Sequence, residues 1–257
     1  MLAVDCAYEI TGSGPAVFFV HGIGARKTAW NEVKSYLDNN FTCISYDLRG
    51  HGESPKGELP YSLEVLVEDL EALRTKLAVG KIHIVGHSLG GMIGPAYAKK
   101  YPQHTLSVSL LSTAAFRTED DNTKVRSVVA SMHEKGIEAV LSTLTNRWFT
   151  DDFIVENPDK VKFRLKQVLA TKADVFLEVF RIYAETEMSS WLHLIVQPCL
   201  VLTGENDGGC NPRLNRLIHS ALPNSELVIL NRYKHSLLME APESVGKQVC
   251  DFLLRQS

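Results

Sequence analysis

The chain has 257 residues, of which 45% are hydrophobic and 22% charged, and this composition excludes a wholly disordered protein. Its formal net charge is −3 at pH 7, which argues against a basic surface for nucleic acid. No apolar run approaches the roughly 20 residues that span a bilayer, so we expect no membrane partner.

The amino terminus and the cysteines bear on where the protein acts. The first residues, MLAVDCAYEITGSG, lack the positively charged stretch and the apolar segment of a secretory signal. The five cysteines are scattered and form neither a CxxC pair nor a zinc-ligand spacing, which is typical of reduced thiols. These features predict a cytoplasmic location.

Strand-like and helix-like segments alternate along most of the chain. The predicted strands are Ala7–Thr11 at an edge, Val17–Val20, Phe41–Tyr46, Ile82–Val85, Ser107–Leu111, Cys199–Leu202 and Leu227–Leu230. Most are apolar without alternation, so we expect the sheet to be covered on both faces. The predicted helices are Leu63–Leu77, Gly91–Lys100, Pro212–Ala221 and Pro242–Leu254. The alternation predicts an α/β fold whose mostly parallel sheet is flanked by helices.

The segment Arg117–Trp191 interrupts this alternation. Apolar residues recur there at helical spacing, and we find no strand-like run. We expect a four-helix insertion between two strands. Because such an insertion can cover the crevice at the carboxyl ends of parallel strands, we interpret residues 117–191 as a lid on a core formed by residues 1–116 and 192–257. A longer crossover connection is the alternative.

The segment Gly86-His87-Ser88-Leu89-Gly90 fits the pattern G-x-S-x-G between a predicted strand and a predicted helix. In that context the serine lies on a sharp, strained turn that exposes its hydroxyl above the sheet. The flanking glycines are needed because strand and helix approach each other too closely for a side chain. Ser88 is therefore our candidate nucleophile, and a simple helix cap is the alternative.

An acyl-transfer enzyme needs two backbone N–H donors where the oxyanion develops. One donor follows the nucleophile, which predicts Leu89, and the other lies in the loop after an early strand. That loop reads FFVHGIG, and Ile23 is our candidate because Gly22 and Gly24 let the backbone approach a substrate. We interpret His21 as a structural imidazole.

A serine hydroxyl also needs a base that takes its proton. His235 follows the last predicted strand and is our candidate base, and Asp207, which follows the preceding strand, is our candidate acid. The order Ser88, Asp207, His235 is that of the hydrolases rather than of the two protease orders. Glu205 is the alternative acid. We expect the side chain of His87 to point away from the site.

The chain resembles the α/β-hydrolase superfamily over essentially its whole length. The motifs FFVHGIG, YDLRGHGES, IVGHSLGG, TGENDGG and KHSLLMEAP carry the resemblance, in the order usual for the family. The resemblance implies the same roles for Ser88, Asp207, His235, Ile23 and Leu89. The segment Arg147–Pro158 is similar to that of 3-oxoadipate enol-lactonases and related esterases. Because the amino terminus is short for the first two strands usual in the family, we expect a reduced sheet edge.

These observations predict a serine hydrolase that cleaves a small carboxylic ester or lactone through an acyl-enzyme. Relatives that open epoxides or displace halide carry Asp where Ser88 stands, which disfavours those activities. A carbon–carbon bond hydrolase acting on ring-fission products, a slow-turnover ligand receptor with the same triad and a non-catalytic scaffold remain alternatives. We expect neither metal nor cofactor, since the sequence has no H-E-x-x-H and no G-x-G-x-x-G after its first strand. The sequence carries no signal of oligomeric state.

The substrate pocket is predicted from large apolar side chains and from cations. The side chains expected to contact a substrate are Trp30, Met132, Arg147, Trp148 and Phe149. For the apolar side chains among these, the alternative is ordinary packing in the hydrophobic core. Arg147 is a candidate partner for a substrate carboxylate, as are Arg26 and Arg117, and a structural or solvated arginine is the alternative for each.

Overall fold

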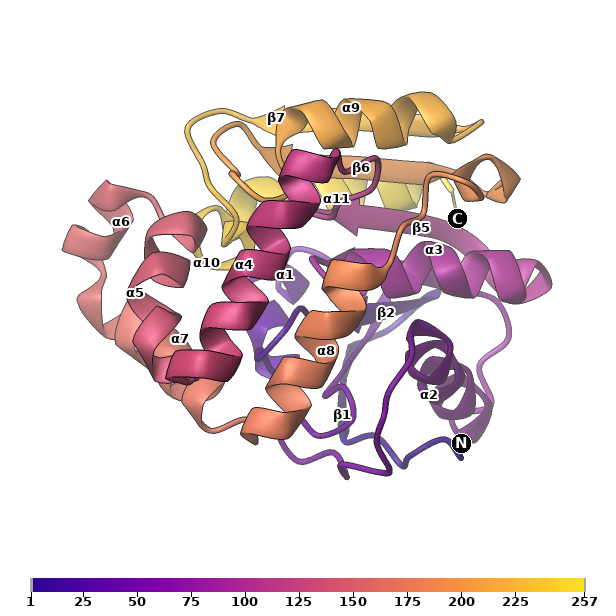
Figure 1. The fold of residues 1–257 in the computed structure, drawn as a ribbon. Coiled ribbons are helices and arrows are strands. Elements are labelled where there is room, and N and C mark those ends of the chain that lie inside the picture. Colours follow the sequence, from indigo (N-terminus) through magenta and orange to yellow (C-terminus); the bar gives the residue numbers. More distant parts are fainter. Residues whose placement is uncertain (1, 257) are drawn as a thin grey trace.

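The computed structural model describes residues 2–256. Seven strands form a sheet in the order β1-β3-β2-β4-β5-β6-β7 (Figure 1). β1 runs antiparallel to β3 at one edge, and the other neighbouring strands are parallel. The strands are β1 (Tyr8–Gly12), β2 (Ala16–Val20), β3 (Thr42–Tyr46), β4 (Ile82–His87), β5 (Thr105–Leu111), β6 (Cys199–Gly204) and β7 (Ser225–Leu230). The predicted α/β fold is confirmed, as is an edge strand close to the predicted Ala7–Thr11, whose antiparallel direction was not predicted.

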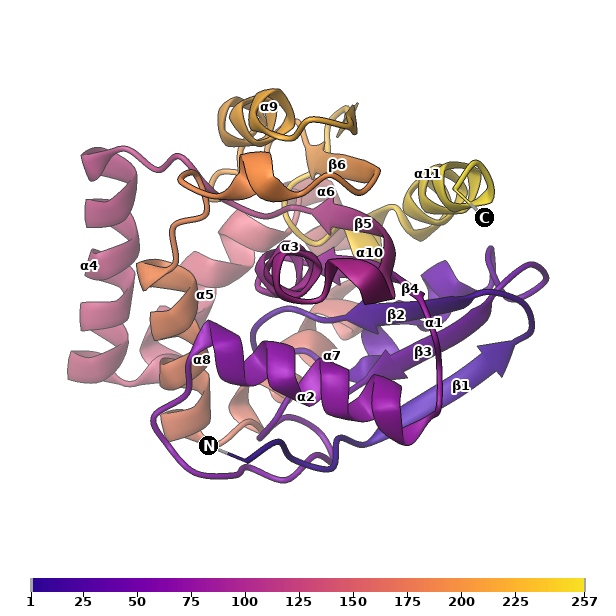
Figure 2. The same cartoon turned by 90° about the vertical axis from the view of Figure 1, so that its right-hand side faces the viewer.

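Both faces of the sheet are covered by helices (Figure 2). Successive residues of a strand point to opposite faces: Phe18 and Val20 of β2 pack with α2 (Leu63–Lys76), α3 (Gly90–Lys100) and α9 (Pro212–Ala221). Val17 and Phe19 pack instead with α1 (Asn31–Lys34), α10 (Leu237–Glu240) and α11 (Pro242–Leu254). Short 3-10 turns lie at η1 (Lys27–Trp30), η2 (Pro102–His104) and η3 (Leu192–Leu194). Burial on both faces explains why the strands read as apolar runs.

Between β5 and β6 the chain forms helices only, which we call the α4–α8 segment. Its helices are α4 (Glu119–Lys135), α5 (Ile137–Trp148), α6 (Asp151–Glu156), α7 (Pro158–Leu169) and α8 (Ala173–Glu185). In Figure 1 and in Figure 2 they gather beyond one end of the sheet. The expected number of four is wrong because α6 has six residues, too few for a hydrophobic period to appear. Thr150 caps this helix by accepting a hydrogen bond from the N–H of Phe153, and Pro158 begins the next one.

Local signals located most boundaries of the core elements. α9 and α11 begin and end at the predicted residues, and both start with a proline at the first helical position. The four-residue helices α1 and α10 carry too little pattern to be predicted. Within residues 2–256, no helix combines the length and the apolar character needed to cross a membrane.

Candidate active site

Ser88 lies on the turn between β4 and α3, where its backbone has a φ of +57°. Residues other than glycine rarely adopt this left-handed conformation, which recurs at active sites where the surrounding structure enforces it. The turn is so tight that a Cβ on Gly86 would lie 2.0 Å from the carbonyl oxygen of Gly90. A Cβ on Gly90 would likewise lie 2.0 Å from the carbonyl oxygen of Val20. The predicted reason for both glycines, close approach of backbone, is therefore confirmed.

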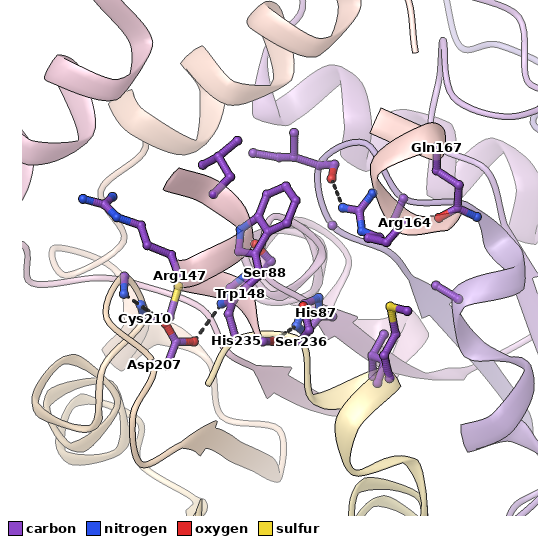
Figure 3. Close-up of a pocket in the computed structure, with 18 of the residues that line it drawn as sticks. His87, Ser88, Arg147, Trp148, Arg164, Gln167, Asp207, Cys210, His235 and Ser236 are labelled. Atoms are coloured by element: carbon purple, nitrogen blue, oxygen red, sulfur yellow. Dashed lines mark hydrogen bonds and ion pairs between the residues drawn. The ribbon is translucent and has the colours of Figure 1, made fainter. Parts of the chain in front are cut away.

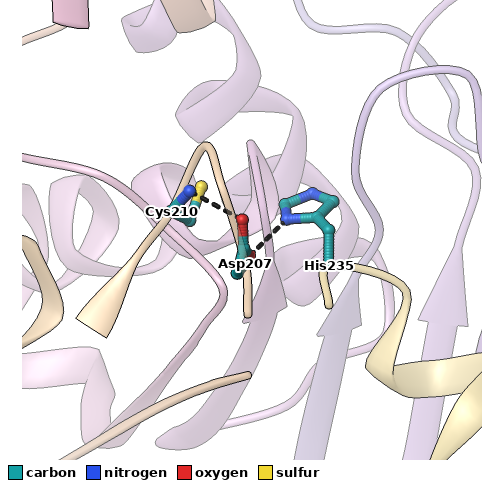
Figure 4. A group of neighbouring side chains, drawn as sticks. All are labelled: Asp207, Cys210 and His235. Carbon is teal, nitrogen blue, oxygen red and sulfur yellow. Dashed lines mark hydrogen bonds and ion pairs between the residues drawn. The ribbon is translucent and has the colours of Figure 1, made fainter. Parts of the chain in front are cut away.

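Asp207 and His235 lie in the loops that follow β6 and β7, which are neighbours in the sheet. Asp207 Oδ2 accepts a hydrogen bond from His235 Nδ1 at 2.7 Å (Figure 4). The other carboxylate oxygen accepts the backbone N–H groups of Gly209 and Cys210 at 3.0 and 2.8 Å. Glu205, the alternative acid, is exposed and accepts a backbone N–H from the loop after β7. The structure thus brings Asp207, and not Glu205, to His235.

Burial and mutual charge have opposite effects on this pair. Burial alone raises the pKa of Asp207 and lowers that of His235, because it disfavours both charged forms. The opposite charge of the partner and the hydrogen bond between them outweigh burial, so the pKa of Asp207 is lowered and that of His235 is raised. Because Nδ1 of His235 faces the carboxylate, Nε2 is the ring nitrogen that can accept a proton.

His87, the residue before Ser88, lies against His235. The ring centroids are 4.9 Å apart, and His87 Nε2 donates a hydrogen bond to the carbonyl oxygen of His235 at 2.9 Å. The expectation that His87 points away is wrong, because β4 continues through this residue and directs it to the same sheet face as Val85, where α10 and α11 lie. Burial lowers the pKa of His87 to about 3. The neutral ring therefore supports the backbone of the base candidate.

Ser88, Asp207 and His235 all line a cavity of about 520 Å³ (Figure 3). Its walls come from the loops of the core and from α4, α5, α7 and α8. The larger apolar side chains that line it are those of Ile23, Val125, Val128, Leu144, Trp148, Phe163, Phe180, Leu238 and Met239. Within residues 2–256 the Ser88 hydroxyl makes no hydrogen bond to His235, and catalytic hydrogen bonds often tighten only when a substrate is bound. An apolar cavity with a few convergent polar groups is typical of a small-molecule site.

Two backbone N–H groups near Ser88 have no acceptor in the part of the chain that the structure describes. They belong to Leu89, the N-cap residue of α3, and to Ile23, in the loop after β2. Gly22 brings this loop close to the nucleophile, since a Cβ on Gly22 would lie 3.0 Å from the Cβ of Ser88. Unpaired N–H donors beside a nucleophile can stabilise an oxyanion. The same loop holds His21, whose ring bonds the carbonyl of Gly22 at 2.7 Å and is a structural imidazole in this fold.

The comparison with known proteins agrees with this geometry. The sequence pattern of the α/β hydrolase fold matches residues 15–242. The chain belongs to the α/β-hydrolase fold family. It is 26% identical to 3-oxoadipate enol-lactonase 2 of Acinetobacter baylyi over 235 residues, which are 91% of this chain and 87% of that protein. The resemblance drawn from the motifs is confirmed.

Solved structures share the fold of this α/β hydrolase. A thermophilic esterase from Thermogutta terrifontis superposes with a TM-score of 0.89 at 26% identity, covering 99% of this chain and 95% of that one. The enol-lactonase from Burkholderia xenovorans LB400 superposes with a TM-score of 0.90 at 23% identity, covering 98% and 97%. The second likeness concerns the fold alone.

Two of the side chains expected to contact a substrate line the cavity of this α/β hydrolase, Arg147 and Trp148. The expected contacts that do not line it are Trp30, Met132 and Phe149. All three are fully or almost fully buried, and the ring of Trp30 packs on that of Phe19 with centroids 5.2 Å apart. These expectations are wrong because a large apolar side chain is stabilised by any closely packed core, not only by a ligand pocket.

Several polar groups of the site were not identified from the sequence. Cys210 lies three residues after Asp207 and is fully buried. Tyr183 of α8 lies with its hydroxyl 3.3 Å from Cys210 Sγ, and Arg164 of α7 lines the cavity. The sequence could have indicated Cys210, because this residue ends the turn ENDGGC, which also contains Asp207. Tyr183 and Arg164 belong to amphipathic helices, where the sequence has no mark that separates a cavity residue from a packing residue.

Among residues 2–256, Asp207, Cys210 and His235 form a cluster of residue types that can ligate a metal ion. Their ligand atoms lie within 4.8 Å of one another (Figure 4). However, the carboxylate bonds the imidazole through one oxygen and two backbone N–H groups through the other. An ion would have to replace the bond between Asp207 and His235. The arrangement therefore fits an oriented imidazole better than a cation site.

Proposed function

We propose that this protein is a serine hydrolase that cleaves a small carboxylic ester or lactone through an acyl-enzyme. The observation that carries the proposal is the hydrogen-bonded pair of Asp207 and His235, which opens on the same apolar cavity as the strained Ser88. Enol-lactonase and esterase relatives support the same class of reaction. A serine with a base oriented by a carboxylate is the arrangement that activates a hydroxyl nucleophile.

In the proposed mechanism, Nε2 of His235 takes the proton of the Ser88 hydroxyl as the oxygen attacks the substrate carbonyl. Asp207 stabilises the imidazolium that forms, and the N–H groups of Ile23 and Leu89 donate to the oxyanion. The imidazolium then protonates the leaving alcohol or enol, which departs and leaves the acyl group on Ser88. A water molecule deprotonated by His235 releases the acid and restores the serine.

We also propose that residues 117–191 act as a lid on the core of residues 1–116 and 192–257. Four of the five helices of the α4–α8 segment contribute side chains to the cavity wall. Six large apolar side chains of the cavity wall belong to this segment: Val125, Val128, Leu144, Trp148, Phe163 and Phe180. We further propose a reducing, cytoplasmic location, because all five cysteines are buried and unpaired.

The test is hydrolysis of p-nitrophenyl acetate and of a panel of small lactones by the wild-type protein and by Ser88→Ala. We expect kcat to fall by about 10⁴- to 10⁶-fold, because a serine nucleophile has no replacement in the mechanism. Ser109→Ala is the matched control, since it removes a buried serine of β5 that does not line the cavity. Equal rates for wild type and Ser88→Ala would contradict the proposal. A stoichiometric burst without turnover would instead indicate the receptor alternative.

A further inference from the structure

The loop after β2, residues 21–26, carries the Ile23 N–H and is hydrogen-bonded to the α4–α8 segment. We call it the oxyanion loop. Arg164 of α7 lies at the wall of the cavity (Figure 3). It donates one guanidinium hydrogen bond to the carbonyl oxygen of Gly24 at 2.6 Å and another to that of Ile23 at 2.8 Å. A planar guanidinium that donates to two adjacent carbonyls restricts both peptide planes. The contact therefore fixes the backbone immediately after the Ile23 N–H.

Arg164 itself is fixed in place. Its guanidinium lies over the ring of Trp148, 5.0 Å from the centroid, which is favourable for a cation on an aromatic face. Burial and the nearby Arg26 lower the pKa of Arg164 to about 10, so the side chain stays charged at neutral pH. The charge strengthens both of its hydrogen bonds to the loop.

Further contacts join the same two elements. In the opposite direction, Arg26 of the loop donates to the carbonyl oxygen of Gln167 at 3.2 Å and to the hydroxyl of Thr171 at 3.1 Å. Gly24 has a φ of +64°, and a Cβ there would lie 2.9 Å from the ring of Phe176 in α8. The oxyanion loop is thus closely packed against α7 and α8.

We propose that Arg164 is a positioning residue that aims the Ile23 N–H at the oxyanion. The inference rests on the proposed serine-hydrolase function and extends the machinery to a residue of the α4–α8 segment. Hydrogen-bond strength depends steeply on donor direction, so releasing the two carbonyls weakens oxyanion stabilisation without touching Ser88 or His235. Loss of the Arg164 contacts should lower kcat by less than deletion of an oxyanion donor, which lowers kcat by about 10²- to 10³-fold.

The experiment compares Arg164→Met and Arg164→Lys with Lys162→Met. Lys162 is an exposed cation on the same helix that does not line the cavity, so its loss removes a charge from α7 and no contact to the loop. Active sites are counted with a fluorophosphonate, and kcat and KM are then measured per active site on p-nitrophenyl acetate. Inhibition by a boronic acid, whose adduct with the serine is tetrahedral, reports on the oxyanion site.

For Arg164→Met we expect kcat to fall by about 10- to 100-fold with KM nearly unchanged, the pattern of an interaction made only in the transition state. The inhibition constant of the boronic acid should rise by a similar factor. Arg164→Lys should recover part of kcat, because an ammonium reaches one carbonyl but lacks the planar fork. The pH dependence should stay that of the wild type, since the Asp207–His235 pair is untouched.

Three outcomes would overturn the inference. One is a kcat for Arg164→Met within twofold of that for Lys162→Met. Another is a raised KM with kcat preserved, which would mean that Arg164 contacts the substrate directly. The third is a normal boronic-acid affinity despite a low kcat. Failure of the proposed function looks different, because then the wild type and Ser88→Ala would hydrolyse the ester equally.

Discussion

Four loops carry the candidate catalytic groups, and they fall into two pairs with different supports. The turn of Ser88 and the loop of Asp207 are stabilised by the sheet and by their own backbone. The N–H of Ser88 donates to Leu111 of β5 at 2.8 Å, and Thr113 donates to the Ser88 carbonyl at 3.0 Å. The loops of Ile23 and His235 are instead bonded to the α4–α8 segment. The α4–α8 segment therefore makes several hydrogen bonds to the loops of Ile23 and His235, whereas it meets the loop of Asp207 through the Tyr183 hydroxyl and Cys210 Sγ.

The loop of His235 is bonded to the carboxyl end of α5 and to the start of α6. The N–H of Ser236 donates to the carbonyl oxygen of Trp148 at 2.8 Å, and Lys234 Nζ donates to the carbonyl oxygen of Asn146 at 3.0 Å. Glu240 accepts the N–H and the hydroxyl of Thr150 at 2.8 and 3.1 Å. Both chain neighbours of the base candidate thus contact one helix end. The position of the base candidate is therefore tied to the carboxyl end of α5.

Asp207→Asn tests the pair supported by the core and should have the largest effect. We expect kcat to fall by about 10⁴-fold, because an amide favours the wrong imidazole tautomer and cannot stabilise the imidazolium. The base must be neutral to accept a proton, and Asp207 raises its pKa above the ordinary 6.5. Activity of the wild type should therefore rise with pH along a limb above that value, and the limb should move to lower pH in Asp207→Asn. The measurement is kcat/KM against pH.

Glu205→Gln is the matched control for this substitution, since it alters an exposed carboxylate two residues away. It should retain the rate and the pH profile of the wild type. An Asp207→Asn protein within tenfold of this control, or one with an unmoved pH limb, would contradict the role of the acid.

Glu240→Ala tests the support that α5 and α6 give to the base loop and should have an intermediate effect. Removing both hydrogen bonds to Thr150 should lower kcat by about 3- to 10-fold, because small displacements of a catalytic group are costly. The free energy of unfolding should fall by about 1 kcal/mol, since a partly buried N–H loses its acceptor. Kinetics and urea unfolding measure the two effects. Glu243→Ala is the control, since it removes an exposed carboxylate at the start of α11, and it should change neither kcat nor the free energy of unfolding. Equal behaviour of the two variants would mean that the contact between Glu240 and Thr150 is dispensable.

Arg147→Met should have the smallest effect, because Arg147 makes no hydrogen bond or ion pair to the loop of Ile23 or to that of His235 within residues 2–256. Within residues 2–256 this exposed cation has no ion-pair or hydrogen-bond partner, whereas Lys160 at the same cavity pairs with Glu32. We expect KM for an ester with a free carboxylate to rise about 2- to 5-fold, which corresponds to an exposed ion pair of up to about 1 kcal/mol. KM for a neutral ester of the same size should not change. An equal effect on both esters would argue against charge recognition by Arg147.

Sequence patterns located candidate residues where a catalytic residue type lies next to a clear turn or strand signal. Ser88 is flanked by the glycines that its turn requires, and Asp207 and His235 each follow an apolar strand, so chain order alone suggested that they meet. The same reasoning failed for Trp30, Met132 and Phe149, because an apolar side chain on a helix does not record whether it faces a core or a cavity. It also failed for His87, whose orientation depends on how far β4 continues toward the turn.

By itself, the sequence determined the order of strands and helices, the parallel sheet and the positions along the chain where catalytic groups can lie, because these depend on local periodicity and turn chemistry. Only the tertiary structure decided which arginine meets which carbonyl. Arg164 and Gly24 are 140 residues apart in the chain, and the hydrogen bond between them depends on how α7 packs over the oxyanion loop. No local pattern encodes such a contact, because it forms only when distant segments come together in the folded chain.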